Sequence, residues 1–156
     1  MAHCDLGAIL QMRGDLAGAE TAFRAAIAAD PQHIDPQMHY NLGSILEQRG
    51  DKAGAVTTYR AVIAADPQYA LAYYSLGNTL RGRGDLAGAE AAYRAAIAAG
   101  PQFAKAHVNL GVTLGNRGDY AGAAASHAKA VQIDPSYSSA QHNLKGALEA
   151  LRRSRS

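Results

Sequence analysis

The sequence contains no tryptophan, only two phenylalanines and a single cysteine. With so few large aromatic residues, a core must be built mainly from leucine, isoleucine, alanine and the eight tyrosines. Because Cys4 is the only cysteine, the chain cannot form an internal disulfide bond. No apolar run approaches the roughly 20 residues that a membrane-spanning helix requires. We therefore expect no insertion into a membrane.

Positive and negative side chains nearly balance, since the formal net charge is +2. The basic residues Lys145, Arg152, Arg153 and Arg155 lie in the last dozen positions, and the rest of the chain is nearly balanced. A nucleic-acid surface needs a broader basic stripe, so nucleic acid is not an expected partner. The start of the chain lacks the basic and apolar regions of a secretory signal, and a lone cysteine fits a reducing compartment. These features predict a soluble, intracellular protein.

A sequence motif repeats along the chain. Leu-Gly pairs recur, each followed by a Gly-Asp pair and then by a proline that ends the repeat. The Leu-Gly pairs are Leu6-Gly7, Leu42-Gly43, Leu76-Gly77 and Leu110-Gly111, and the Gly-Asp pairs are Gly14-Asp15, Gly50-Asp51, Gly84-Asp85 and Gly118-Asp119. The step is 34 residues except for the first, which is 36 because the stretch around Ile34 and Asp35 carries two more. A fixed period of this size indicates stacked structural units, which usually form binding surfaces.

Each unit is expected to be a pair of helices. In the third unit, Tyr73, Leu76 and Leu80 follow helical spacing, and a second helical pattern begins after Gly84-Asp85. Glycine can cap the end of the first helix with a positive φ angle, and aspartate can accept amide hydrogen bonds at the start of the second. A proline such as Pro101 then ends the second helix.

Small and large residues recur at matched positions. The glycine of each Leu-Gly pair and the alanines at 19, 55, 89 and 123 indicate close packing of helices. The bulky residues that recur opposite are Phe23, Tyr59, Tyr93 and, in the last unit, His127. We interpret His127 as a hydrogen-bonded core residue rather than a ligand.

This combination resembles the tetratricopeptide repeat family. The third unit carries its pattern as Tyr73, Leu76-Gly77, Leu80, Gly84-Asp85, Ala89, Tyr93, Ala96 and Pro101. The resemblance implies an all-α fold, a right-handed superhelical α-solenoid of four helix-turn-helix repeats with a C-terminal capping helix. The expected boundaries are 1–33, 34–69, 70–103 and 104–137 for the repeats, 138–151 for the capping helix and 152–156 for a basic tail. The two-residue insertion should lengthen the first loop between repeats.

In that family the first helices of the repeats line a concave groove. The positions that the resemblance assigns to a peptide-binding groove hold both apolar and polar side chains, with two cations. They are Tyr40, Asn41, Leu71, Tyr74, Asn78, Arg81, Lys105, Val108, Asn109, Val112 and Asn143. Side-chain amides donate and accept, so Asn41, Asn109 and Asn143 could pair with peptide backbone, as a similar asparagine ladder does in O-linked N-acetylglucosamine transferases. The alternative is that these amides only bond to neighbouring backbone.

A second family precedent is a clamp for a C-terminal carboxylate, of which only Lys105 is matched here. Lys105 and Arg81 could nevertheless favour an acidic peptide. No nucleophile has a recognisable partner base, and the histidines are too dispersed to predict a metal site. We therefore expect no catalytic residues, no metal and no cofactor.

The sequence predicts a non-catalytic protein–protein interaction module that binds a peptide segment of a partner protein in its groove. Two alternatives stay open. The chain could be a structural unit that assembles into a dimer or filament through an uncapped N-terminal repeat. It could instead be the targeting region of a larger protein, such as a glycosyltransferase.

Overall fold

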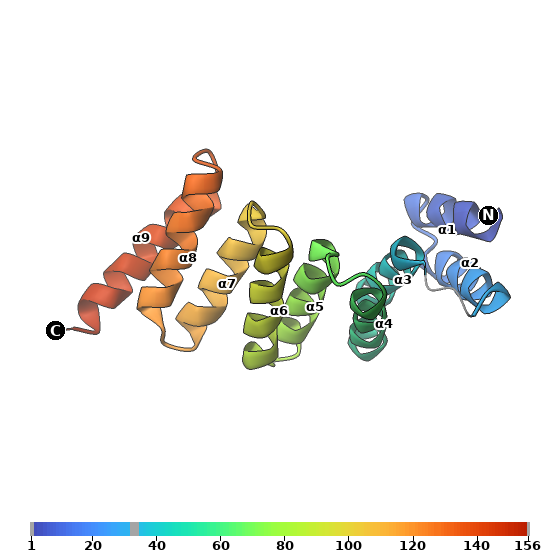
Figure 1. Ribbon diagram of the computed structural model, residues 1–156, viewed down its shortest axis with the longest axis horizontal. Coiled ribbons are helices and arrows are strands. Elements are labelled where there is room, and N and C mark those ends of the chain that lie inside the picture. Colours follow the sequence, from blue (N-terminus) through green and yellow to red (C-terminus); the bar gives the residue numbers. More distant parts are fainter. Residues whose placement is uncertain (1, 32–34, 156) are drawn as a thin grey trace. The chain divides into compact units, whose positions relative to one another are not determined.

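The computed structural model describes residues 2–31 and 35–155, with the side chains of the first helix described from Asp5. Over those residues the chain forms nine α-helices and no β-strand (Figure 1). The helices are α1 Ala2–Met12, α2 Leu16–Ala29, α3 Pro36–Gln48, α4 Lys52–Ala65, α5 Ala70–Gly82, α6 Leu86–Ala99, α7 Ala104–Asn116, α8 Tyr120–Ile133 and α9 Ser138–Arg153. The all-α prediction of helix pairs with one further helix at the end is confirmed. Helix α9 continues two residues past the end expected for a capping helix at position 151.

The helices fall into two compact units, Met1–Thr79 and Leu80–Ser156. Within the first, α1 packs on α2, α2 on α3 and α3 on α4. Within the second, α6 packs on α7, α7 on α8 and α8 on α9, while α7 also touches α9. Contacts between successive helices are the mark of a solenoid, in which each repeat leans on its neighbours in sequence.

The joint inside each repeat forms as the sequence predicts. Gly50 has a φ angle of +86°, and the glycines at the other three joints lie between +79° and +85°. The amide of Asp51 donates to the carbonyl of Leu46 at 2.8 Å, which satisfies an otherwise unpaired carbonyl at the end of α3. The Asp51 carboxylate then accepts from the amide of Gly54 at 2.9 Å and caps the start of α4.

The loop between the first two repeats is longer than the others. Six residues, 30–35, separate α2 from α3, whereas four residues separate α4 from α5, α6 from α7 and α8 from α9. Ile34, in the two-residue insertion, lies outside the described residues. Asp35 is described, and its carboxylate accepts from the amide of Met38 at 3.0 Å at the start of α3. The insertion thus supplies a side-chain cap that α7 and α9 lack.

In the first, second and last hairpins a ring lies against a glycine of the first helix. A methyl group added at Gly43 would stand 2.6 Å from the Tyr59 ring, and one at Gly7 would stand 2.9 Å from Phe23. The alanines expected at the close helix contacts, at positions 19, 55, 89 and 123, are at most 2% exposed. The predicted pairing of small and bulky residues is therefore confirmed, because only glycine leaves room for the ring.

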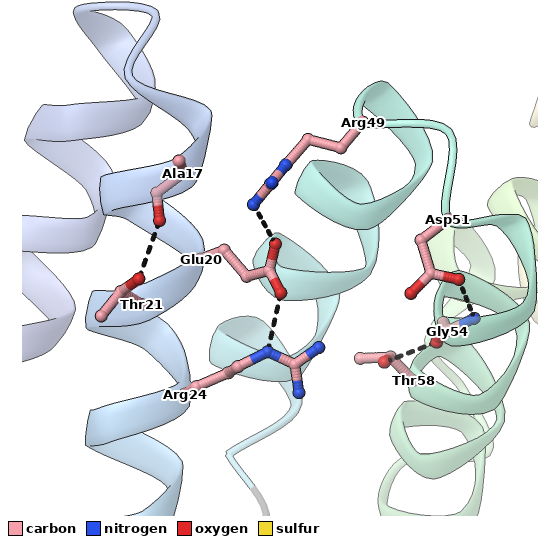
Figure 2. Close-up of polar contacts among 8 residues, drawn as sticks. All are labelled: Ala17, Glu20, Thr21, Arg24, Arg49, Asp51, Gly54 and Thr58. Carbon is pink, nitrogen blue, oxygen red and sulfur yellow. Dashed lines mark hydrogen bonds and ion pairs between the residues drawn. The ribbon is translucent and has the colours of Figure 1, made fainter.

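An ion-pair cluster joins successive repeats in each unit. The Glu20 carboxylate on α2 accepts from Arg24 Nε at 2.8 Å and from Arg49 Nη1 at 2.5 Å, as Figure 2 shows. In the second unit Glu90 pairs with Arg94 and Arg117 in the same way. Arg49 follows the last residue of α3, and its guanidinium reaches across to the preceding repeat.

A second polar cluster lies inside the first unit. Glu47 on α3 accepts from the Tyr59 hydroxyl at 3.2 Å and from Thr79 Oγ1 at 3.0 Å. Tyr59 is 1% exposed and Thr79 is 1% exposed, so the carboxylate satisfies two buried hydroxyl groups. Burial, followed by the nearby Glu47 charge, raises the pKa of Tyr59 far above its ordinary value of 10.0. This side-chain network fixes α4 and the end of α5 against α3.

Candidate functional site

In the first unit, the groove positions predicted on α3 hold Tyr40 and Asn41. The Tyr40 ring lies 5.8 Å from the Tyr59 ring and 5.5 Å from the Tyr69 ring, measured between centroids. Its hydroxyl oxygen is 3.3 Å from Ser75 Oγ on α5. Asn41 Oδ1 accepts from Gln37 Nε2 one turn earlier at 3.0 Å. These contacts hold the Tyr40 side chain in place. The amide of Asn41, one member of the expected asparagine ladder, is hydrogen-bonded to another residue of its own helix.

The groove positions on α5 differ in exposure. Leu71 is 47% exposed, so its apolar side chain is accessible to a partner. Tyr74 and Asn78 are half-buried on the same helix. Half-buried polar residues beside an exposed leucine give this part of α5 the mixed character expected for contact with a peptide.

In the second unit, Lys105 on α7 lines a cavity of about 300 Å³ with Phe103, Ala104, Asp134 and Tyr137. Lys105 itself is exposed. Because Asp134 borders the same cavity, this pocket is not uniformly basic. Arg81, the other predicted cation, is half-buried near the end of α5.

Further along α7, three predicted groove residues have different surroundings. Val108 is 6% exposed and packs with Ala130 and Ala140, so its side chain belongs to the core and offers little surface to a ligand. Asn109 is half-buried. Val112 is also half-buried, and it lines a second cavity that Asn143 of α9 lines too.

The second cavity has a volume of about 260 Å³ and lies among α7, α8 and α9. Glycines form part of its wall on α7 and α9, and the rest consists of alanines, a valine, two asparagines, a tyrosine and two histidines. The lining residues are Gly111, Val112, Gly115, Asn116, Tyr120, Ala123, His127, His142, Asn143, Gly146, Ala147 and Ala150. Two residues of the predicted groove, from different helices, thus share one cavity.

The sequence reasoning missed most of this wall. A signal was present, because Gly115 stands where the second repeat has Glu47, and His127 stands where it has Tyr59. Both residues are smaller than their counterparts in the second repeat, and both line this cavity. The pattern alone did not show that α9 leaves this space open.

His127 is in the core, but its expected hydrogen bonding is not complete. The side chain is 3% exposed, and its Nδ1 atom is buried without a hydrogen-bond partner in the described part of the chain. The interpretation of His127 as a fully hydrogen-bonded core residue is therefore wrong at this atom. Burial lowers the pKa of His127, so the ring is neutral at pH 7. A neutral imidazole carries one donor and one acceptor.

Within residues 2–31 and 35–155, no group of three or more histidine, cysteine, aspartate or glutamate side chains could hold a metal ion. In the same ranges no helix combines the length and the apolar character needed to cross a bilayer.

Comparison with known proteins agrees with this architecture. The family model for the tetratricopeptide repeat matches residues 4–70 and 74–138. No curated protein sequence matches the chain.

Three solved structures show how similar the fold is. The crystal structure of MamA protein has 26% sequence identity and a TM-score of 0.88, over 96% of this chain and 80% of that one. MamA 41-end from Desulfovibrio magneticus RS-1 has 28% identity and a TM-score of 0.79, over 86% of this chain and 75% of that one. YrrB, described as a TPR protein with an unusual peptide-binding site, shares the fold at 23% identity and a TM-score of 0.79, over 89% of this chain and 71% of that one.

The family match covers most of the sequence, and the glycine joints, aspartate caps and ring-on-glycine cores recur along it in register. Proteins built from these hairpins generally serve as non-catalytic modules for protein interaction. The chain belongs to the tetratricopeptide repeat family.

Proposed function

We propose that this protein is a non-catalytic module that binds a peptide segment of a partner protein on the first helices of its repeats. The contacts would come from α3, α5, α7 and the capping helix α9. The proposed contact residues are Tyr40, Asn41, Leu71, Tyr74, Asn78, Arg81, Lys105, Asn109, Val112 and Asn143, with Val108 supporting α7 from the core.

The observation that carries the proposal is the shared cavity of Val112 and Asn143. A peptide needs apolar surface for its side chains and amide groups for its backbone, and these two residues supply one of each. The exposed Leu71 supports the proposal independently, because it offers apolar surface on another of the same helices. YrrB gives a precedent for peptide binding on this fold.

Charge would contribute modestly to the choice of peptide. Lys105 and Arg81 favour acidic groups, but Asp134 borders the same cavity as Lys105 and offsets part of that attraction. We therefore propose a weak preference for acidic peptides, which should fall as salt screens the charges.

A peptide library titrated against the full chain tests the proposal. The double variant Lys105→Ala/Asn109→Ala should weaken the bound peptides by about tenfold or more, because it removes a charged and an amide partner. Lys129→Ala is the matched control, since Lys129 is exposed on α8 and donates to Gln132 beside it. If every peptide binds both variants as tightly as the native chain, the assignment of the groove is wrong.

A second candidate function, self-assembly, is favoured by α1. Leu6 and Ile9 are 46% and 48% exposed, and Met12 is 88% exposed, so this helix presents a stripe of apolar side chains. A second copy of the chain could cover that stripe. Light scattering over a concentration series should then show a rising mass that Ile9→Glu abolishes. A strict monomer at high concentration would remove this candidate.

A further inference from the structure

The cavity among α7, α8 and α9 exists because three residues that line it have smaller side chains than the residues at the matching positions of earlier repeats. In the second repeat the Tyr59 ring covers Gly43, and its hydroxyl meets Glu47. In the last repeat the shorter His127 covers Gly111, and Gly115 replaces the glutamate.

The third missing side chain is on the capping helix. Gly146 occupies the position of Val112 in the preceding first helix. A methyl group added at Gly146 would meet no atom within 4 Å, so the space beside it is open. Glycine inside a helix costs stability relative to alanine, and neither close packing nor a positive φ angle requires it here.

A buried polar side chain is also among the residues that line this space. His127 lines the cavity at 3% exposure, and its Nδ1 atom has no hydrogen-bond partner among the described residues. An unpaired buried polar atom is costly, and a ligand that reaches the ring can recover part of that cost. Burial keeps the ring neutral at pH 7, so it does not select a charged ligand.

The rest of the wall has a defined chemistry. Apolar surface comes from Val112 and the alanines of α8 and α9, and none of the described residues that line the cavity is a lysine, arginine, aspartate or glutamate. Asn116 and Asn143 add amides that donate and accept. A charged side chain entering this space would lose hydration without an opposite charge, whereas a neutral one with an apolar body would not. The volume of about 260 Å³ exceeds the roughly 150 Å³ that suffices for benzene.

We propose that this cavity is the anchor pocket of the peptide site and takes one aromatic side chain with a neutral hydrogen-bonding group, a tyrosine of the partner. The ring would fill the space left by Gly115 and Gly146, and the phenol would bond to Asn143 or to the His127 ring. A phenol both donates and accepts, which suits amides and a neutral imidazole together. The proposal rests on the proposed function, because it names the side chain that such a peptide would insert.

Small analogues of side chains test the pocket on the full chain. In ¹H–¹⁵N NMR titrations, p-cresol should shift the amides of Val112, Gly115 and Gly146. It should bind about three- to tenfold more tightly than toluene, which has the ring without the hydroxyl. Toluene binding as tightly as p-cresol, or shifts confined to residues outside the cavity, would overturn the proposal.

A matched pair of variants tests the location. Gly146→Leu should fill the cavity and weaken p-cresol binding at least tenfold, while Gly146→Ala should change it less than threefold. Both variants keep the helix, because alanine and leucine favour helix more than glycine does. His127→Tyr gives a second plug, since tyrosine occupies the equivalent position in α4 and α6. Melting curves confirm folding, and p-cresol binding unchanged in Gly146→Leu and His127→Tyr would overturn the proposal.

The peptide titrations separate failure of the pocket from failure of the function. Peptides weakened by both Lys105→Ala/Asn109→Ala and Gly146→Leu, and by replacement of one tyrosine with alanine, would support both proposals. Peptides weakened by Lys105→Ala/Asn109→Ala alone would overturn the pocket and leave the function standing. If p-cresol binds but no peptide does, both the function and the assignment of the pocket to a peptide side chain are wrong.

Discussion

The carboxylate of Glu20 accepts a hydrogen bond from the guanidinium of Arg49, 29 positions further along the chain. Glu90 and Arg117 form the equivalent pair at a separation of 27. The difference of two is the insertion in the first loop. The insertion therefore lengthens the connection while leaving this contact between successive repeats in place.

Removing Glu20 should destabilise the first unit. Its side chain is 18% exposed and Arg49 is 42% exposed, so solvent screens much of the interaction. We expect Glu20→Ala to cost about 1 kcal/mol, because exposed pairs contribute 0.2–1 kcal/mol and two arginines share this carboxylate. Urea unfolding measures the change. Glu149→Ala, on the exposed side of α9, is the control and should change stability by less than about 0.5 kcal/mol.

The coupling of this pair can be measured separately. A double-mutant cycle of Glu20→Ala with Arg49→Ala should give a coupling energy of about 0.5 kcal/mol that shrinks in 1 M salt. A coupling of zero at low salt would contradict a stabilising role for the contact between repeats.

Alkaline pH should destabilise the first unit through Tyr59. Burial and then the Glu47 charge raise the pKa of this phenol in the folded protein above its ordinary 10.0. The unfolded chain loses the proton first, so the stabilisation is complete below pH 10 and is lost as pH rises above it. Tyr59→Phe should make the melting temperature less sensitive to pH above 10. Part of the sensitivity should remain, because burial also raises the pKa of Tyr69.

Mild acid should destabilise the second unit through its buried histidines. Burial lowers the pKa of His127 below its ordinary 6.5. Burial also lowers the pKa of His107, against the effect of its hydrogen bond to the Pro101 carbonyl, while nearby Lys129 lowers it further. Because the unfolded chain takes up protons first, this stability is present above pH 6.5 and falls as pH decreases toward 5.

Replacing His127 by phenylalanine isolates its share of that pH dependence. The first repeat already carries Phe23 over Gly7 at the equivalent place, so the ring has a precedent in the chain. We expect His127→Phe to flatten the decrease in melting temperature between pH 7 and pH 5. At pH 7 it should stabilise the protein by about 1–3 kcal/mol, because it removes an unpaired buried nitrogen. Lower stability of this variant at pH 7 would contradict the prediction.

Two glycines in helices should respond in opposite ways to alanine. At Gly43 the new methyl group would lie 2.6 Å from the Tyr59 ring, so Gly43→Ala should destabilise by about 1–3 kcal/mol. At Gly146 the methyl group meets nothing within 4 Å, so Gly146→Ala should stabilise by about 0.5–1 kcal/mol. Thermal melts of the two variants against the native chain check both signs.

Local features were predictable because each is determined by residues close in sequence. The Gly50 joint, the Asp51 cap and the Tyr59 ring over Gly43 all lie within one repeat, and their residue types admit few other conformations. These predictions are confirmed.

Features that join different repeats were harder to predict. The contact of Arg49 with Glu20 depends on a long, flexible side chain that reaches a different repeat, and the repeat pattern does not show which group such a side chain will meet. Val108 was expected to face a ligand, but α8 and α9 cover it. Small residues on two neighbouring helices, Ala130 on α8 and Ala140 on α9, pack against Val108, and the residue pattern along α7 does not contain them.

The joints and caps have a consequence for the length of the molecule. Each glycine bend and each aspartate cap uses atoms from a single block of the chain, as Gly84, Asp85 and Gly88 do in the third. Copying or deleting one repeat would leave the glycine bend and the aspartate cap of every other repeat with their own hydrogen-bond partners. The number of repeats could therefore change by gene duplication or loss without compensating substitutions at the bends and caps of the other repeats.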